Sequence, residues 1–586
     1  MATPLSPSAA AAASESAHLH FIKHRGEQEY PKQVWYLTLS ALAVATLVNL
    51  SSIAWAFYRV HVRGRDSSTT TAPQTRRFSI WNIPAAILTG MRIVALRWNI
   101  RLGRTYTMSL MEVFVTLIYL SALLIWEFVH TNNLDPDFWS NKAAHIAAAQ
   151  LPLLPALSSK NNVIGWLTGI GHEKLIVLHR VAARCILVLI WVHLWGRFDI
   201  GFTGVDDIAN FGWQQLGLTA GTTYTLAIVL SIRPIRQYSY EAFYFTHVVL
   251  VFVFILTAYL HASNPGFGYY VWPTWVVWGF DRLIRLARAL ILNVFYKPAH
   301  AEGTLSLVTP DSLRLTLTRR VPFGWRPGQH VFLAFPSVAT VPFEAHPFTI
   351  ANVSASGEQE LAFFIRAREG LTQRLVERVA GAEKEGVKVP VLVDGPYGLP
   401  PNLAPYSTAI FVAGGTGVSY TLPLMLDLVK RAREGSSLTK RILFVWVVRN
   451  EEHIDWLSTS LADAQASAST TSSLSLDTQI FVTRKREADV ATDDVPYSSQ
   501  GRSTPPEKSA EAAELGGLTP VYRRPEVREL LHSELQTAEG PVSVDVSGPP
   551  LMIKDIRSAL AKVGPAVLDV LRGGPTVHFH AENFTL

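Results

Sequence analysis

Four histidines at a repeated spacing are the residues of this sequence best suited to chemistry. His179 and His193 lie in one apolar segment, His247 and His261 lie in another, and 14 residues separate the members of each pair. Along a helix, 14 residues rise roughly 21 Å and return to nearly the same face. A six-coordinate heme iron takes one neutral imidazole nitrogen from each side. We therefore predict two stacked hemes, with His179 opposite His247 and His193 opposite His261.

The alternative for these histidines is a structural one. A single histidine in an apolar helix is more often a core residue that is hydrogen-bonded to its neighbours. Two pairs with the same spacing in two apolar segments favour iron ligands instead, because ionisable groups inside membranes are costly and usually functional. The only cysteine, Cys185, excludes a disulfide framework, a cysteine-ligated zinc site and an iron–sulfur cluster.

The segments that carry the histidines belong to an apolar first half. Only 17% of the 586 residues are charged, against roughly 25% in soluble proteins. A membrane-spanning helix needs roughly 20 apolar residues. Seven spans are predicted, with six as the alternative because the third and seventh are weaker: Val34–Tyr58, Met108–Val129, Ala143–Leu157, Lys174–Trp195, Trp213–Ile232, Tyr240–His261 and Tyr269–Leu292.

The arginines predict how these spans are oriented. The connection 59–104 after the first span holds nine arginines, which places it in the cytosol by the positive-inside rule. Seven spans then put the N-terminus outside and the C-terminal half inside, with His179 and His247 nearer the cytosol. The net charge of +6 gathers beside apolar segments, which fits membrane orientation and no nucleic-acid partner. Residues 1–33 are expected to be a flexible tail, followed by a helical membrane domain over 34–296.

The second half is predicted to begin with a flavin-binding domain. Residues 297–404 contain antiparallel strand patterns at Ser306–Leu317 and Gly328–Phe335, which indicate a small β-barrel. Arg366 ends a later strand, and Gly370 and Thr372 open a helix. A cation next to free N–H groups at a helix N-terminus can bind a pyrophosphate.

Residues 405–586 are predicted to form an α/β nucleotide-binding domain. The strand Ala409–Ala413 leads through Gly414, Gly415, Thr416 and Gly417 into a helix, which is the pattern of a dinucleotide phosphate site. The next strand, Ile442–Val448, ends in Arg449, where the 2′-phosphate of NADPH would need a cation. Residues from about 484 to 518 have few apolar side chains, and we expect a disordered insertion there.

Taken together, these motifs resemble the fungal ferric and cupric reductases of the ferric reductase and NADPH oxidase superfamily. The resemblance runs from about Ala144 to the C-terminus. Besides the histidine pairs it rests on these segments: Gln150-Leu151-Pro152-Leu153-Leu154, Lys160-Asn161-Asn162, His346-Pro347-Phe348-Thr349, Gly395-Pro396-Tyr397-Gly398, Gly414-Gly415-Thr416-Gly417, Ser547-Gly548-Pro549-Pro550 and Glu582-Asn583-Phe584.

The resemblance implies a ferredoxin-reductase-like soluble half and a role for each motif. The residues expected to line the flavin of FAD are His346, Pro347, Phe348 and Thr349, with Thr349 near its reactive edge. Arg366, Gly370 and Thr372 would hold the FAD pyrophosphate, Gly414 to Gly417 with Gly548 and Pro549 would bind NADPH, and Phe584 would stack over the flavin. Two positions depart from the family: Ser547 replaces the usual cysteine near the nicotinamide, and Lys160 replaces an arginine.

The implied activity is an NADPH-dependent ferric-chelate reductase. Electrons would pass through FAD and two b-type hemes to external Fe(III), and Cu(II) is a second candidate acceptor. The plasma membrane is the expected location, with the vacuolar membrane as the alternative and an iron-uptake oxidase or permease as a candidate partner. Two rival functions remain: a superoxide-producing NADPH oxidase, and a non-enzymatic heme membrane sensor or scaffold. The preferred chelate and the oligomeric state are left open.

Overall fold

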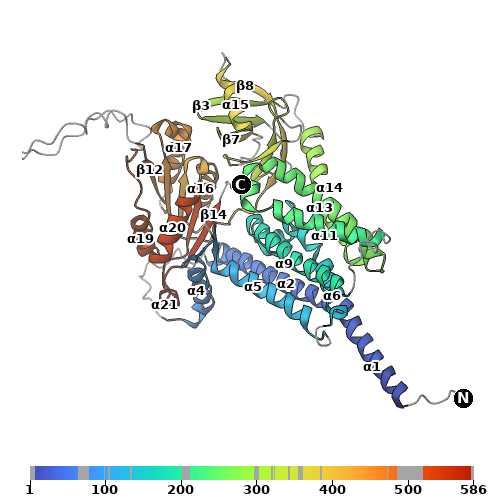
Figure 1. The fold of residues 1–586 in the computed structure, drawn as a ribbon. Helices are drawn as coiled ribbons and strands as arrows, with labels where there is room; N and C mark the ends of the chain where they lie inside the picture. The colour runs from blue at the N-terminus through green and yellow to red at the C-terminus, as the bar shows by residue number, and fades with distance from the viewer. Residues whose placement is uncertain are drawn as a thin grey trace, which may run out of the picture. The chain divides into compact units, whose positions relative to one another are not determined.

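The computed structural model describes residues 7–63, 78–97, 99–102, 106–131, 135–200, 212–295, 302–318, 321, 324–340, 344–353, 360–382, 386–471, 473–484 and 519–582. The chain divides into two compact units, which are considered separately. The first comprises Met1–Ser51 and Met111–Leu286, and the second comprises Ser52–Leu110 and Ala287–Leu586 (Figure 1). The predicted disordered insertion beyond Arg484, together with Phe584, lies outside the described residues.

The first unit is helical throughout its described elements. Its helices are α1 (Pro7–His24), α2 (Tyr30–Tyr58), α5 (Leu110–Phe128), α6 (Pro136–Gln150), α7 (Leu153–Ser158), α8 (Val163–Thr168), α9 (His172–Asp199), α11 (Gly212–Leu230), α12 (Arg233–Tyr238), α13 (Tyr240–Ser263) and α14 (Trp272–Leu290). Part of the segment expected to be a flexible tail is helical in α1, where a run of alanines has high helix propensity.

Three helical stretches among the described residues are long and apolar enough to cross a membrane. They are Ala11–Val62, His172–Asp199 and Tyr240–Ser263. The second contains His179 and His193, and the third contains His247 and His261. The other predicted spans also contain helices, but the count of seven spans stays a prediction.

Close packing of α6 against α9 sets the position of the C-terminal half of α9. Ile146 of α6 and Ile186 and Leu189 of α9 are buried in one apolar cluster. Further along α9, a Cβ added to Gly196 would lie 2.5 Å from the Cβ of Ser140. Only glycine allows this approach, which brings the main chain of Ser140 toward His193.

The flavin half of the second unit consists of two antiparallel sheets and one helix. Their strand orders are β7-β4-β3-β8 and β6-β5-β9. The elements are β3 (Glu302–Thr309), β4 (Ser312–Thr318), β5 (His330–Ala334), β6 (Ala345–Thr349), β7 (Glu360–Arg366), β8 (Val387–Pro390), β9 (Leu392–Tyr397) and α15 (Leu371–Ala380). A closed barrel stays a prediction.

One strand prediction in this half was wrong. The segment Ser306–Leu317 is not one strand but parts of β3 and β4, which form a hairpin. Asp311 makes the turn, because its Oδ1 accepts hydrogen bonds from the hydroxyls of Thr309 and Ser312.

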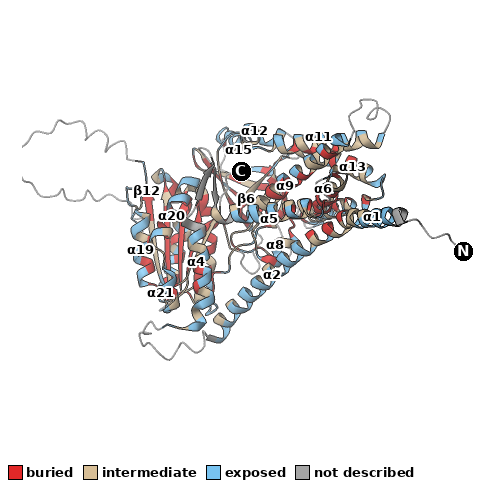
Figure 2. Ribbon diagram, turned by 60° about the horizontal axis from the view of Figure 1, so that its bottom comes forward, coloured by how far each residue is buried: buried red, intermediate tan, exposed pale blue. Residues whose placement is uncertain are grey.

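The nucleotide half is a parallel sheet between two layers of helices. Its five strands have the order β12-β11-β10-β13-β14, and Figure 2 shows them buried between the helices. They are β10 (Thr408–Gly414), β11 (Arg441–Val448), β12 (Ser475–Val482), β13 (Val542–Ser547) and β14 (Val577–Glu582). One face packs on α16 (Val418–Arg433) and α17 (Ser458–Ser469), and the other packs on α19 (Val527–Thr537) and α20 (Pro550–Val563). The strand order reverses at β10, and ligands of such sheets bind at that point.

The arginine-rich connection after the first predicted span contributes to the second unit. It forms α4 (Ile83–Arg97) and a hairpin of β1 (Asn99–Leu102) and β2 (Tyr106–Ser109). Helix α4 packs against α20 and α21 (Val567–Leu571). Residues 52–110 therefore group with the second unit, and a membrane domain over 34–296 stays a prediction.

Candidate functional site

The four paired histidines are oriented by hydrogen bonds at their Nδ1 atoms. Three of the four rings donate to main-chain carbonyls: His179 to Leu154 at 3.0 Å, His193 to Ser140 at 2.8 Å and His261 to Trp213 at 2.7 Å. A carbonyl oxygen can only accept, so the proton of each ring lies on Nδ1 and the lone pair of Nε2 is available to a metal. The fourth, His247, places Nδ1 3.2 Å from Ser231 Oγ.

The outer pair has the separation that a shared iron requires. The ring centroids of His193 and His261 lie 6.5 Å apart, with their planes at 62°. Two metal–nitrogen bonds of about 2 Å, each followed by about 1 Å to the ring centre, give roughly 6 Å. The geometry of the pair His193 and His261 therefore fits a bis-imidazole iron site.

Space for the outer ring depends on a glycine of α11. A Cβ added to Gly217 would lie 2.7 Å from Cε1 and 2.8 Å from Nδ1 of His261. One turn later, a Cβ added to Gly221 would meet only Ile190, at 3.8 Å. The absence of a side chain at residue 217 therefore lets His261 reach the Trp213 carbonyl.

The predicted dinucleotide motifs meet at the carboxyl ends of β10 and β13. A Cβ added to Gly414 would lie 2.7 Å from Cδ of Pro549, and one added to Gly417 would collide with the carbonyl of Ser547. Gly415 has a φ of +55°, and its carbonyl accepts a hydrogen bond of 3.0 Å from Trp446 Nε1. Thus the two loops approach each other closely only because both are rich in glycine.

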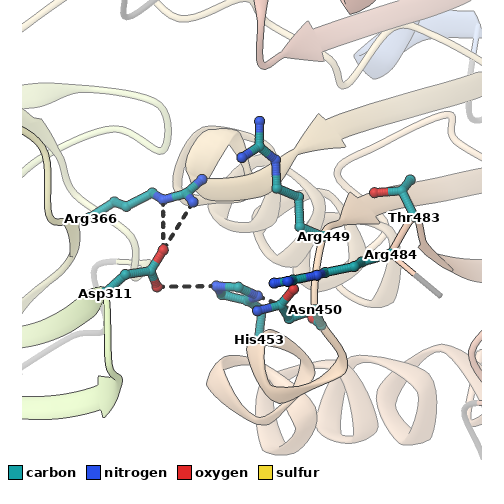
Figure 3. Close-up of a pocket in the computed structure, with 7 residues that line it drawn as sticks. All are labelled: Asp311, Arg366, Arg449, Asn450, His453, Thr483 and Arg484. Carbon is teal, nitrogen blue, oxygen red and sulfur yellow. Dashed lines mark hydrogen bonds and ion pairs between the residues drawn. The ribbon is translucent and has the colours of Figure 1, made fainter. Parts of the chain in front are cut away.

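A cavity of about 430 Å³ lies beside this glycine loop (Figure 3). Its lining carries three guanidinium groups, one carboxylate and one imidazole: Asp311, Arg366, Arg449, Asn450, His453, Thr483 and Arg484. Arg449 follows β11 and Arg484 follows β12, and these strands are neighbours in the sheet. The excess of positive charge suits a phosphate group.

Asp311 connects the flavin half to the nucleotide half at this cavity. Its Oδ2 accepts from Arg366 Nε at 3.1 Å and Nη2 at 2.9 Å, and its Oδ1 lies 3.3 Å from His453 Nε2. Although partial burial opposes it, the hydrogen bonds from Thr309 and Ser312 and the charge of Arg366 lower the Asp311 pKa to about 2. Arg366, expected at the FAD pyrophosphate, thus lines the cavity that also contains Arg449.

The other predicted pyrophosphate residues stand at the start of α15. Gly370 precedes the helix with a φ of +75°. Thr372 Oγ1 accepts a hydrogen bond of 2.9 Å from the N–H of Arg368. The hydroxyl proton of Thr372 is therefore still available to a phosphate oxygen.

The predicted flavin-lining segment forms strand β6. His346 Nε2 lies 3.1 Å from Glu344 Oε1, whose second oxygen accepts from Arg374 of α15 at 2.9 Å. Burial opposes ionisation of Glu344, but the hydrogen bond to His346 and the charge of Arg374 lower its pKa overall. Thr349 is buried at the end of the strand, and Pro347 and Phe348 are half-buried.

Two buried polar groups of β13 lie beneath the nucleotide loops. Ser547 is fully buried, and its Oγ has no hydrogen-bond partner among the described residues. Asp545 is also fully buried, and burial raises its pKa to about 6, although His580 and the hydroxyl of Ser543 act in the opposite direction.

Three family models match the chain, and their order agrees with this arrangement. A ferric reductase like transmembrane component covers residues 143–258, an FAD-binding domain covers 299–401 and a ferric reductase NAD binding domain covers 406–561. The first range contains three of the four paired histidines, and the third contains both nucleotide loops. The chain is therefore similar to ferric reductases in its membrane part and in its nucleotide-binding part.

Relatives that carry the name of ferric reductases are similar to this chain over part of their length. The chain is 23% identical over 484 residues to a ferric/cupric reductase transmembrane component of Candida albicans, covering 77% of this chain and 60% of that protein. It is 28% identical over 348 residues to a probable cell surface ferric reductase of Aspergillus oryzae, covering 55% and 44%. A solved ferredoxin NADP+ reductase from Neisseria gonorrhoeae matches 48% of this chain and 97% of its own, with 14% identity and a TM-score of 0.30.

Several residues of this candidate site were not predicted from the sequence. They are Asp311, Arg374, His453, Thr483 and Arg484. Arg484 follows a strand as Arg449 does, so the same signal was available once β12 had been recognised. Asp311 and His453 carry no such signal, because they lie 142 residues apart in the sequence and come together only through the contact between two domains.

Proposed function

We propose that this ferric reductase transfers electrons from cytosolic NADPH, through FAD and two bis-histidine b-type hemes, to Fe(III) chelates outside the plasma membrane. Cu(II) is proposed as a second acceptor. The observation that carries the proposal is the His193–His261 separation of 6.5 Å in a chain that also has a dinucleotide pocket. The name of the Aspergillus oryzae relative, a cell surface ferric reductase, supports the plasma membrane.

The cationic cavity is proposed to select NADPH. Arg449 and Arg484 project from neighbouring strands and would bind the 2′-phosphate, which NADH lacks. The loop from Gly414 to Gly417 would receive the pyrophosphate at the N-terminus of α16. Ser547, with its buried hydroxyl free to form a hydrogen bond, would contact the nicotinamide end.

The flavin half is proposed to hold FAD next to this cavity. His346 to Thr349 would line the flavin, with Thr349 at its reactive edge, and Gly370 and Thr372 would bind the pyrophosphate. Phe584 would cover the flavin until nicotinamide displaces it. When bound, FAD would take the hydride and release single electrons, which the hemes would relay. The Glu344 contacts with His346 and Arg374 fix the strand that would line the flavin.

The membrane histidines are proposed to hold the iron atoms through Nε2. Their Nδ1 hydrogen bonds fix three rings before any metal binds, so little reorientation would accompany binding. His179 and His247 would form the cytosolic site, and His193 and His261 the outer site. The two levels, roughly 21 Å apart along each helix, would divide the crossing into short steps.

Reconstitution of the full chain into proteoliposomes tests the proposed function. NADPH is added on the side of the soluble half, and Fe(III)-citrate with a ferrous chelator on the other. We expect two Fe(II) for each NADPH oxidised, a preference for NADPH over NADH, and loss of Fe(II) formation in His193→Ala. Superoxide as the main product, unaffected by Fe(III)-citrate, would instead identify an oxidase. NADPH oxidation that needs no acceptor across the membrane would overturn transmembrane transfer.

A further inference from the structure

Helix α4 meets the nucleotide-binding domain through one face and through its N-terminal end. The carbonyl of Leu571, the last residue of α21, accepts hydrogen bonds from the N–H of Ser79 at 3.2 Å and from Asn82 Nδ2 at 3.3 Å. Arg92 Nη1 donates to the carbonyl of Val577 at 3.2 Å. The carbonyl of Leu571 lies at the end of α21, where carbonyls have no partner within the helix. The carbonyl of Val577 lies at the start of β14. The contact therefore satisfies polar groups of the domain as well as packing α4.

The packed face of α4 is close to the domain along its length. Ala86 is 2% exposed and Thr89 is 5% exposed. A Cβ added to Gly90 would lie 3.4 Å from Cγ2 of Val567. Burial between α4 and the domain lowers the pKa of the Arg92 guanidinium. This face has the small and polar residues of a helix–domain interface.

The opposite face of α4 is exposed and apolar. Residues 80, 84, 87, 91 and 94 recur at steps of three or four, so they form one stripe along the helix. The large exposed side chains on or beside this stripe are Ile80, Trp81, Ile83, Ile87, Leu88, Met91 and Val94. Trp81, in the 3-10 turn Ile80–Asn82 that precedes α4, is 86% exposed. A helix facing water normally presents polar residues there, and an apolar stripe marks an interaction surface.

The position of α4 in the chain indicates what covers this stripe. The connection from α2 to α5, residues 59–109, is flanked on both sides by predicted membrane spans. It contains nine arginines and a single acidic residue, Asp66. Basic residues beside an apolar helical face, with a tryptophan at its end, are typical of helices that lie on an anionic leaflet. The 15 residues of α4 rise only about 22 Å, too little to cross roughly 30 Å of hydrocarbon.

We propose that α4 is an interfacial helix that binds the nucleotide-binding domain on one face and the anionic lipid of the cytosolic leaflet on the other. The domain is thereby held at the membrane surface by a contact with α20, α21 and β14, in addition to its covalent connection through the flavin half. The occupant of the stripe is a lipid surface, to which Trp81, Ile87 and Met91 contribute apolar side chains. This inference needs neither NADPH specificity nor heme binding.

Lipid quenching of a fluorophore in the full chain tests the proposal. In a Cys185→Ala background, Ile87→Cys and Met91→Cys are each labelled with bimane and placed in nanodiscs of phosphatidylcholine and phosphatidylserine. Leu307→Cys on β3, which is also exposed, serves as the control. Nitroxide-labelled lipid is expected to reduce fluorescence by about half or more at positions 87 and 91 and to leave position 307 unchanged. Two positions are used so that a local folding defect at one does not decide the result.

Each other outcome contradicts the proposal. Quenching by aqueous iodide, without quenching by nitroxide lipid, would show that the stripe faces water. Protection that depends on protein concentration would show that a second copy of the chain covers it. Equal nitroxide quenching in discs of pure phosphatidylcholine would remove the role of anionic lipid. Activity does not enter the measurement, so failure here is distinct from failure of the proposed function.

Discussion

The imidazole rings of His193 and His261 have centroids 6.5 Å apart and planes inclined at 62°, and each donates its Nδ1 proton to a main-chain carbonyl. If this pair binds one of two hemes, His193→Ala should remove one site and preserve the other. We expect the reduced-minus-oxidised b-type spectrum to lose about half of its amplitude. His145→Ala is the control, because His145 is also buried and hydrogen-bonded to a main-chain carbonyl. An unchanged spectrum in His193→Ala would exclude the outer site.

A glycine substitution tests the same site without touching a ligand. Gly217→Ala would place a methyl group 2.7 Å from the His261 ring, so the ring must move from its carbonyl partner. We expect loss of the same half of the heme spectrum as in His193→Ala. Gly221→Ala, one turn away, meets only Ile190 at 3.8 Å and should retain both hemes. Equal spectra for the two alanine variants would contradict this steric account.

Coenzyme choice should depend on the two strand-end arginines. Arg449→Ala and Arg484→Ala each remove a charged donor from the cavity. A hydrogen bond to a charged group contributes about 1.5–3 kcal/mol, so the KM for NADPH should rise about 10- to 100-fold. The KM for NADH should change little, because NADH has no 2′-phosphate. Steady-state kinetics with both coenzymes measure this, with Arg523→Ala, at an exposed position outside the cavity, as the control.

Replacement of Ser547 should affect the rate of flavin reduction more than the free energy of unfolding. Its buried hydroxyl has no hydrogen-bond partner among the residues that the structure describes, so Ser547→Ala should change the free energy of unfolding by less than about 1 kcal/mol. If that hydroxyl contacts bound nicotinamide, the rate of flavin reduction in stopped flow should fall while the KM for NADPH stays nearly constant. Ser547→Cys, the family residue, should restore or exceed the original rate. Unchanged flavin reduction in Ser547→Ala would place the nicotinamide elsewhere.

Asp545 should make the nucleotide-binding domain less stable as the pH rises. Burial raises its folded-state pKa to about 6, above the ordinary value near 4 of the unfolded chain. The folded carboxyl therefore keeps its proton over a range in which the unfolded one has lost it, and stability falls between about pH 4 and pH 6. Asp545→Asn should abolish this fall and stabilise the domain at pH 7 by up to roughly 3 kcal/mol.

Hydrogen exchange of peptides from β10 and β13 can measure this pH dependence locally. Asp463→Asn on α17, where the carboxyl is exposed, should leave the pH profile unchanged. A wild-type profile that is flat from pH 5 to pH 7 would mean that Asp545 is already ionised in the fold.

The histidine pairs could be found from the sequence because helical spacing is a local property. The glycine loops and Arg449 could also be predicted from the sequence, since each follows a buried strand directly. The hairpin at Asp311 was missed because Leu313, Leu315 and Leu317 alternate as in a strand, although Pro310 and Asp311 are common turn residues. The antiparallel register of β3 and β4 and the side-chain hydrogen bonds of Asp311 show that the chain turns there.

Contacts between distant segments could not be predicted. Asn82 binds the carbonyl of Leu571 across 489 residues, and no local pattern in either segment indicates the other. Helix α4 is also apolar on its exposed face, so hydropathy alone cannot separate it from a short span. Arg366 was predicted to bind the FAD pyrophosphate because it stands at the end of a strand. Its guanidinium forms an ion pair with Asp311, and the orientation of Asp311 depends on the hairpin between β3 and β4.

The Nδ1 acceptors of the membrane histidines have an evolutionary consequence. Three of them are main-chain carbonyls on α6, α7 and α11, and no single side-chain replacement can delete a carbonyl. The hydrogen bonds of these three imidazoles therefore do not depend on which side chains stand at residues 140, 154 and 213, although Gly217 must stay small to leave room for His261. At His247 a side chain is involved, because its Nδ1 meets the hydroxyl of Ser231. A single substitution at Ser231 can therefore change the hydrogen bonding of His247 directly.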